Sequence, residues 1–252
     1  SDMILDRFIR YGADGAFDPS TTNIVSMRIA GVEWQVIEET GNRIGIRCIR
    51  RLVSETLVRT EMLTRYALRR GDDISVTDAM DVYDETTGGQ AVHYRSCKRN
   101  GDQLVDIRGE IRPSSVHRTT TIVRFRVGYD RTMIIEPVSE YQRITGWDTR
   151  VQFPETLRRA VSAGIATAPI SFELREYSIF DDQSTRFDCS VAHRDETEPA
   201  VRSTYRVTMT DMDKKEVVVC RFDSAGDIIE AVRPSKNLTV RRVTEADARR
   251  QM

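Results

Sequence analysis

The sequence predicts an α+β fold, mainly an antiparallel β meander or a closed barrel, with two principal helices. Three observations predict it. Segments rich in Val, Ile, Thr, Tyr and Phe recur along the chain, Gly and Asn separate some of them at hairpin spacing, and only two segments carry apolar residues at helical spacing. The 252 residues suit a single domain, 1–252, although a repeated helix-then-strands order would also allow two halves, 1–150 and 151–252.

Two hairpins are expected early in the chain. The first joins segments 24–39 and 43–52 through Gly41-Asn42, and the second joins 92–99 and 103–111 through Asn100-Gly101. The Asn-Gly pair predicts a tight type I′ turn, because both central residues of that turn need a positive φ. Further strands are expected at 119–129, 132–136, 149–153, 170–179, 185–193, 201–210, 216–222, 228–232 and 238–243.

The two helices are expected at 54–70 and from Pro154 onward. Ser54 can cap the first and Gly71 can end it. Its apolar stripe is Leu57, Val58, Met62, Leu63 and Tyr66. In the second helix, Leu157, Val161 and Ile165 share one side. The acidic segment 72–90 is expected to be a solvated loop, and the tail 244–252 a short helix or a frayed end.

Positive charge comes almost entirely from arginine, with 34 Arg and 4 Lys. Arginine pairs with carboxylates and phosphates in a flat, bidentate geometry, although a GC-rich genome would produce the same bias. Arg118, Arg124 and Arg126 lie on one face of an expected strand. We predict a solvent-accessible site there, firstly for acidic protein side chains and secondly for phosphate. Acidic segments 72–85 and 181–198 are alternative partners that would make the cluster structural.

Catalytic and metal-binding motifs are missing. The sequence has no GxxxxGK[ST], GxGxxG, HExxH or GxSxG, and no calcium-loop spacing around Asp81 and Glu85. No nucleophile or orienting acid is identifiable beside the histidines, of which His93 and His117 are the candidate bases for RNA cleavage. We therefore expect no catalytic residue, no metal and no cofactor.

The four cysteines, the only ones in the sequence, do not form CxxC pairs; they are Cys48, Cys97, Cys189 and Cys220. We expect reduced, unpaired thiols in a cytoplasmic or nuclear protein. No apolar run reaches the roughly 20 residues of a membrane helix, and no signal peptide is visible, so no membrane association is expected.

Polar residues alternate with apolar ones in several expected strands, for example Arg202, Thr204 and Arg206. In a closed sheet such faces would line a charged tunnel, an architecture that resembles the triphosphate tunnel fold. That resemblance implies arginines and lysines around a polyphosphate and paired glutamates around a metal. The family's Glu-x-Glu motif does not lie on an expected strand here, because Glu196-Thr197-Glu198 stands in an acidic loop before Pro199. The resemblance therefore implies a non-catalytic relative.

The sequence favours a non-catalytic scaffold or binding subunit of an intracellular assembly, acting through protein–protein contacts with a partner or a second copy. The alternative is an RNA- or phosphate-processing barrel enzyme that holds phosphates with arginines, with nucleic acid as a partner. A closed sheet in which arginines converge with at least two carboxylates would favour the enzyme. An exposed apolar groove would favour the binding subunit.

Overall fold

A computed structural model describes residues 27–70, 73–100, 103–127, 132–145, 147, 150–166, 171–179, 183–192 and 204–250. It contains a 14-stranded antiparallel sheet in the order β8-β7-β6-β5-β4-β3-β2-β1-β14-β13-β12-β11-β10-β9. The strands are β1 (Arg28–Glu39), β2 (Asn42–Val53), β3 (Leu57–Arg70), β4 (Asp73–Thr86), β5 (Ala91–Asn100), β6 (Gln103–Arg112), β7 (Ser115–Val127), β8 (Thr132–Thr145), β9 (Ser171–Ser178), β10 (Gln183–Ala192), β11 (Thr204–Asp211), β12 (Val217–Asp223), β13 (Ile228–Arg233) and β14 (Leu238–Val243).

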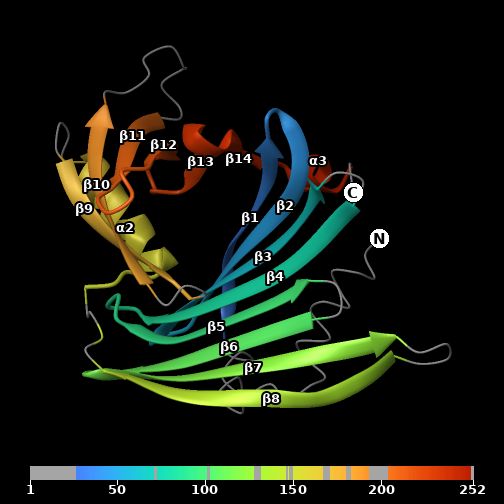
Figure 1. Ribbon diagram of the computed structural model, residues 1–252. Coiled ribbons are helices and arrows are strands. Elements are labelled where there is room, and N and C mark those ends of the chain that lie inside the picture. The colour runs from blue at the N-terminus through green and yellow to red at the C-terminus, as the bar shows by residue number, and fades with distance from the viewer. Residues whose placement is uncertain are drawn as a thin grey trace.

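The antiparallel meander is confirmed, but the fold is mainly β rather than a balanced α+β. The sheet is not closed by hydrogen bonds, since β8 and β9 are its two outer strands. Strands β1–β8 form one meander and β9–β14 another, and the first and last strands join them, with Trp34 opposite Val243. Figure 1 shows the sheet curving strongly, with helix α2 (Pro154–Ala166) on its concave side near β9.

The expected helix at 54–70 is wrong, because this segment is strand β3. Its charges, spaced to pair along a helix, pair with neighbouring strands instead. Arg59 binds Asp84, Glu61 binds Arg50 on β2, and Arg65 lies 2.8 Å from Asp78. Cross-strand partners therefore outweigh the helical spacing of the apolar residues.

The acidic segment 72–90 is also not a loop, because most of it forms β4, which supplies acidic partners to Arg59 and Arg65. Of the predicted strand 149–153, the described residues 150–153 form no strand and contribute a single parallel bridge, between Gln152 and Glu176. The first hairpin turns at Thr40 and Gly41, with φ of 51° and 76°, one residue before the expected pair. The second hairpin is confirmed, with Asn100 opposite Gln103, but residues 101–102 lie outside the described residues and the predicted turn type stays untested.

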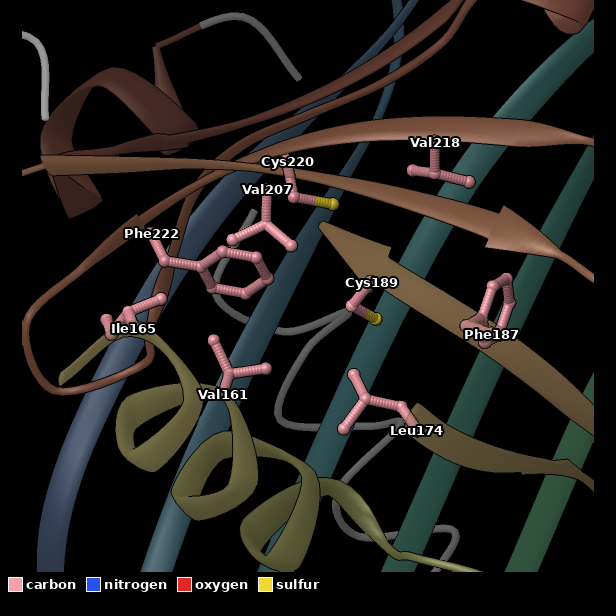
Figure 2. Close-up of a cluster of buried hydrophobic side chains, with 9 residues drawn as sticks. All are labelled: Val161, Ile165, Leu174, Phe187, Cys189, Val207, Val218, Cys220 and Phe222. Atoms are coloured by element: carbon pink, nitrogen blue, oxygen red, sulfur yellow. The ribbon is translucent and has the colours of Figure 1, made fainter. Parts of the chain in front are cut away.

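Helix α2 begins at Pro154 as expected, and Val161 and Ile165 are buried. They pack into the hydrophobic cluster of Figure 2, whose other members come from the strands: Leu174, Phe187, Cys189, Val207, Val218, Cys220 and Phe222. The tail contains the short helix α3 (Glu245–Arg249), whose Thr244 hydroxyl accepts a hydrogen bond from the Asp247 N–H. It packs on the convex side, where Ala248 contacts the cluster around Trp34.

All four cysteines are free, as predicted. Within the described residues, no helix has the length and apolar character needed to cross a membrane.

Candidate binding site on the concave face

Five charged side chains of alternating sign come together on the concave face of the sheet, and we call them the interior charge line. They are Lys98 on β5, Asp81 on β4, Arg47 on β2, Glu176 on β9 and Arg233 on β13. Each interacts electrostatically with the next: Asp81 with Lys98 and Arg47, and Glu176 with Arg47 and Arg233. Strands far apart in the sheet order therefore meet across its concave side.

The strand register places these residues on one face. Arg47 lies opposite Thr64, which lies opposite Ala79, and Ala79 lies opposite Lys98. Residues opposite each other in antiparallel strands share a face of the sheet. On the other wall, Glu176 and Arg233 follow by two residues Leu174 and Ala231, which contact the apolar cluster.

Direct contacts within the interior charge line are few. Arg47 Nε donates a hydrogen bond to Thr64 Oγ1 at 3.1 Å, and the Ser96 hydroxyl donates one to Asp81 Oδ1. In the described part of the chain, no ion pair within 4.0 Å joins Arg47 or Arg233 to either carboxylate of the line. Arg47 and Arg233 are thus close enough to these carboxylates to interact with them, but they form no contact ion pair with them.

The surrounding protein shifts the ionisation of these groups. Burial raises the pKa of Glu176, and the charges of Arg233 and Arg47 only partly oppose it. Burial likewise raises the pKa of Asp81 and lowers that of Arg47. Glu176 is nevertheless exposed to water, and Arg47 and Arg233 are partly exposed. The charged groups therefore lie on a part of the concave face that is accessible to water.

We expect Glu176→Gln to raise the melting temperature at pH 7. The folded-state pKa of Glu176 lies above its unfolded value, so its ionisation costs stability above the folded pKa, and this cost disappears as the pH falls below about 4.5. Thermal unfolding of both proteins from pH 4 to pH 8 measures the effect. A lower melting temperature for the variant at pH 7 would mean that Glu176 mainly stabilises the two arginines.

Aromatic side chains bring β9 against β4 and β5, and we call them the aromatic seam. Tyr83 packs edge-on against Phe153 at 5.1 Å between ring centres, Tyr94 lies 5.5 Å from Tyr177, and Trp147 lies 4.8 Å from Tyr177. Side-chain packing therefore bends the sheet back on itself at a place without a hydrogen-bonded ladder between these strands.

The N-terminus of α2 is held by a carboxylate from β4. Glu85, which is 1% exposed, accepts hydrogen bonds from the backbone N–H groups of Glu155 and Thr156 at 2.9 and 3.0 Å, and from the Thr156 hydroxyl. A carboxylate satisfies the free N–H groups of a helix start and complements its dipole. Glu85 thereby fixes where the helix enters the concave side.

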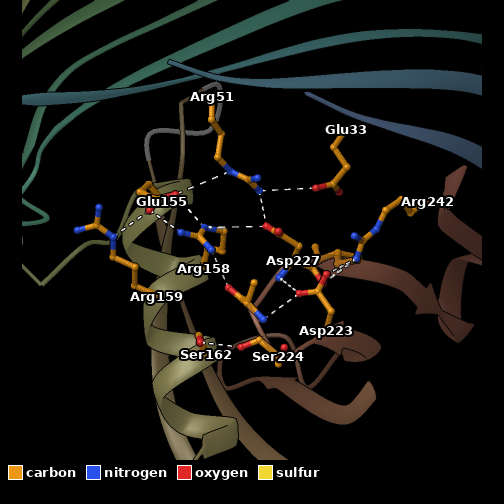
Figure 3. A network of polar contacts seen from close by, with 12 residues as sticks. Glu33, Arg51, Glu155, Arg158, Arg159, Ser162, Asp223, Ser224, Asp227 and Arg242 are labelled. Atoms are coloured by element: carbon orange, nitrogen blue, oxygen red, sulfur yellow. Dashed lines mark hydrogen bonds and ion pairs between the residues drawn. The ribbon is translucent and has the colours of Figure 1, made fainter. Parts of the chain in front are cut away.

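A network of ion pairs fixes the same helix to β1, β2 and the turn between β12 and β13 (Figure 3). Arg51 is its centre, with Asp227 at 2.5 Å, Glu33 at 3.6 Å and Glu155 at 3.8 Å. Arg158 of α2 binds Glu155 at 2.8 Å and donates to the carbonyl of Ala225 at 2.7 Å. These contacts fix the helix against the sheet.

Five other strand arginines pair with acids on the convex face. These pairs are Arg50–Glu61, Arg59–Asp84, Arg65–Asp78, Arg95–Asp106 and Arg241–Glu38. The alternating arginines in these strands therefore join strand to strand, which is one of the uses that the sequence pattern suggested.

The structure separates Arg118 from the other two arginines of the predicted site, Arg124 and Arg126. Arg118 is buried at 9% exposure, opposite Gly109, and Arg124 is exposed. Six residues of strand separate them, or about 20 Å. Arg126 lies on β7 opposite Met133, and its side chain is outside the described residues. A binding role for the three arginines stays a prediction. The sequence predicted that Arg118 is solvent-accessible, whereas the structure buries it.

We expect Arg118→Gln to lower the melting temperature by several degrees, and Arg124→Gln to leave it within about one degree, because buried groups dominate mutational losses. Thermal unfolding of the two single variants compares the same change at two positions of one strand. If both variants change the melting temperature equally little, Arg118 belongs to a solvent-accessible site after all.

The remaining candidates from the sequence lie elsewhere. His93 is on the convex face, 4.0 Å from Asp84, and the His117 ring bonds the Tyr141 hydroxyl at 2.5 Å. His193 is outside the described residues. Among the described residues, no three His, Cys, Asp or Glu side chains form a group that could hold a metal ion. Asp81 and Glu85 have separate roles, in the interior charge line and at the start of α2.

Sequence reasoning missed Glu176 and Arg233. Both occupy positions in phase with apolar residues on short strands, as in Phe172, Leu174, Glu176. A charge on the apolar face of a strand was the available signal, and it carries no information about which distant strand faces it.

No protein-family model matches the sequence, and no curated protein does. A crystal structure of a beta-barrel-like protein of domain of unknown function DUF1849 from Brucella abortus is similar in fold. Its TM-score is 0.57 at 9% sequence identity, and the match covers 84% of this chain and 92% of that one. At this identity the likeness concerns the fold alone.

Proposed function

We propose that the chain is a non-catalytic binding protein that acts through protein–protein contact and receives a segment of its partner on the interior charge line. Glu176 and Arg233 carry this proposal. Both side chains are accessible to water, yet neither side chain forms a hydrogen bond or a contact ion pair with any described residue. Because no described side chain pairs with these two charged groups and both are accessible, their presence here favours a site completed by groups from outside.

A polypeptide segment suits this arrangement. The line carries both signs in alternation, and an extended peptide presents donors, acceptors and charged side chains along its length. A non-catalytic role is supported by the cysteines, because burial raises the pKa to about 11 for Cys48 and Cys97 and about 12 for Cys189 and Cys220. Such thiols are protonated at neutral pH and are weak nucleophiles.

The test is selection of a displayed library of short random peptides against the wild-type protein. Selected peptides are then measured on the double variant Glu176→Gln/Arg233→Gln. We expect this variant to lose binding. The matched control is Glu173→Gln/Arg186→Gln, which removes an ion pair of 3.1 Å from the opposite face of β9 and β10 with the same change in charge. Peptides that bind all three proteins equally would contradict the proposal.

A second candidate function is phosphate processing, favoured by the convergence of Arg47, Arg233 and Lys98 with two carboxylates. Phosphoryl transfer needs such cations and normally a divalent metal ion. Incubation with tripolyphosphate and Mg²⁺, followed by measurement of released phosphate, tests it. Release that disappears in Arg233→Gln would support it, and no release above the buffer rate would reject it.

A further inference from the structure

We propose that the guanidinium groups of Arg233 and Arg47 hold an anionic group of the ligand, a carboxylate or a phosphate, and that Glu176 weakens this binding. The inference rests on the proposed function and names the chemistry that its site accepts.

The unused hydrogen-bond donors at the site favour a ligand group that accepts hydrogen bonds. None of the guanidinium N–H groups of Arg233 has an acceptor among the described residues, and the Arg47 guanidinium uses only Nε, toward Thr64. On the acidic side, one oxygen of Asp81 already accepts from Ser96. A guanidinium is a donor only, and its flat fork matches the oxygens of a carboxylate or phosphate. Unused donors therefore exceed unused acceptors.

The charges of the surroundings agree with this assignment. The interior charge line has three cations and two carboxylates, and Arg47 and Arg233 both interact with Glu176. Beyond Arg233 lies Glu216, whose carboxylate accepts from Ser235 at 3.0 Å and pairs with Lys236 at 3.6 Å. Tyr83 faces the same groups from β4, and Cys220 from β12. The excess of positive charge favours an anion.

The position of Glu176 predicts a direction for the change in affinity that a purely structural role would not produce. An incoming anion gains charge-assisted hydrogen bonds from Arg233 and is repelled by Glu176. Removing the arginine and removing the glutamate should therefore change affinity in opposite directions. If both residues only maintained the fold, their removal would weaken binding in the same direction.

The experiment is isothermal titration of the full chain with two probes, sodium tripolyphosphate and succinate, at constant ionic strength. We expect at least one probe to bind the wild type. Arg233→Gln should lower its association constant about tenfold or more, the size expected for a hydrogen bond to a charged group. Glu176→Gln should raise it several-fold. Arg186→Gln, on the opposite face, should leave it unchanged.

Each outcome decides the question. If only succinate binds, the ligand group is a carboxylate. If only tripolyphosphate binds, it is a phosphate. If both bind, the site accepts an anion without preference between the two. Failure of both probes to bind, or weakening by both variants, overturns the anion assignment. If peptides selected on the wild type still lose binding in Glu176→Gln/Arg233→Gln while neither anion binds, the binding function stands and only this inference fails.

Discussion

Replacing Arg51 by methionine is expected to lower the free energy of unfolding by about 3 to 5 kcal/mol, the loss typical of removing one partner from a buried ion pair. The substitution leaves the carboxylates of Glu33, Glu155 and Asp227 near one another without their shared cation. Urea unfolding at pH 7 measures the loss. It should shrink as the pH falls toward 4, because protonation relieves the repulsion between the three carboxylates.

The matched control is Arg241→Met. Arg241 pairs with Glu38 at 3.1 Å on the surface, where its side chain is 47% exposed, so we expect a loss below about 1 kcal/mol. Similar losses for the two variants would mean that the network in Figure 3 does not hold the helix to the sheet.

Gly109→Ala is expected to destabilise the protein by about 3 kcal/mol, at the upper end for overpacking. A Cβ at this position would lie 2.2 Å from carbon atoms of the Tyr94 ring. Tyr94 is 2% exposed and packs between Phe153 and Tyr177 in the aromatic seam, so the ring has no free space to move into. Urea unfolding again gives the measurement.

Two further variants isolate the cause. Gly88→Ala places its Cβ 3.6 Å from the nearest atom, an ordinary contact, and should change stability little. Adding Tyr94→Leu to Gly109→Ala should recover part of the loss, since the shorter side chain removes the clash. If Gly109→Ala is neutral, the seam is not tightly packed.

How far the sequence predicts this fold differs between its elements. Strand β14 and the start of α2 have local signals, a short β-branched run and a proline at a helix start, and both were predicted at the observed residues. Strand β3 was mistaken for a helix because Glu61 and Arg65 have helical spacing as well as partners on β2 and β4. Only the neighbouring strands, which the segment itself does not encode, decide between the two.

The candidate site was harder to predict for the same reason. Asp81 was noted only as part of an acidic segment, without a connection to an arginine on another strand. Glu176 and Arg233 join the interior charge line only because the sheet bends back through the aromatic seam. This curvature depends on contacts between Tyr94 and Tyr177, distant in the chain, which no short motif specifies.

The junction of β1 with β14 has a consequence for how the chain folds. Every other strand pairing in the sheet joins neighbours in sequence, whereas this one places Trp34 opposite Val243. Pairings of high contact order form slowly, because the entropy of closing a long loop is lost before the contact is gained. Each half of the sheet can assemble by pairing strands that are neighbours in sequence. The two halves can pair with each other only after β14 has left the ribosome. We expect the two halves to behave as separate cooperative units in hydrogen exchange, with β14 as the strand that couples them.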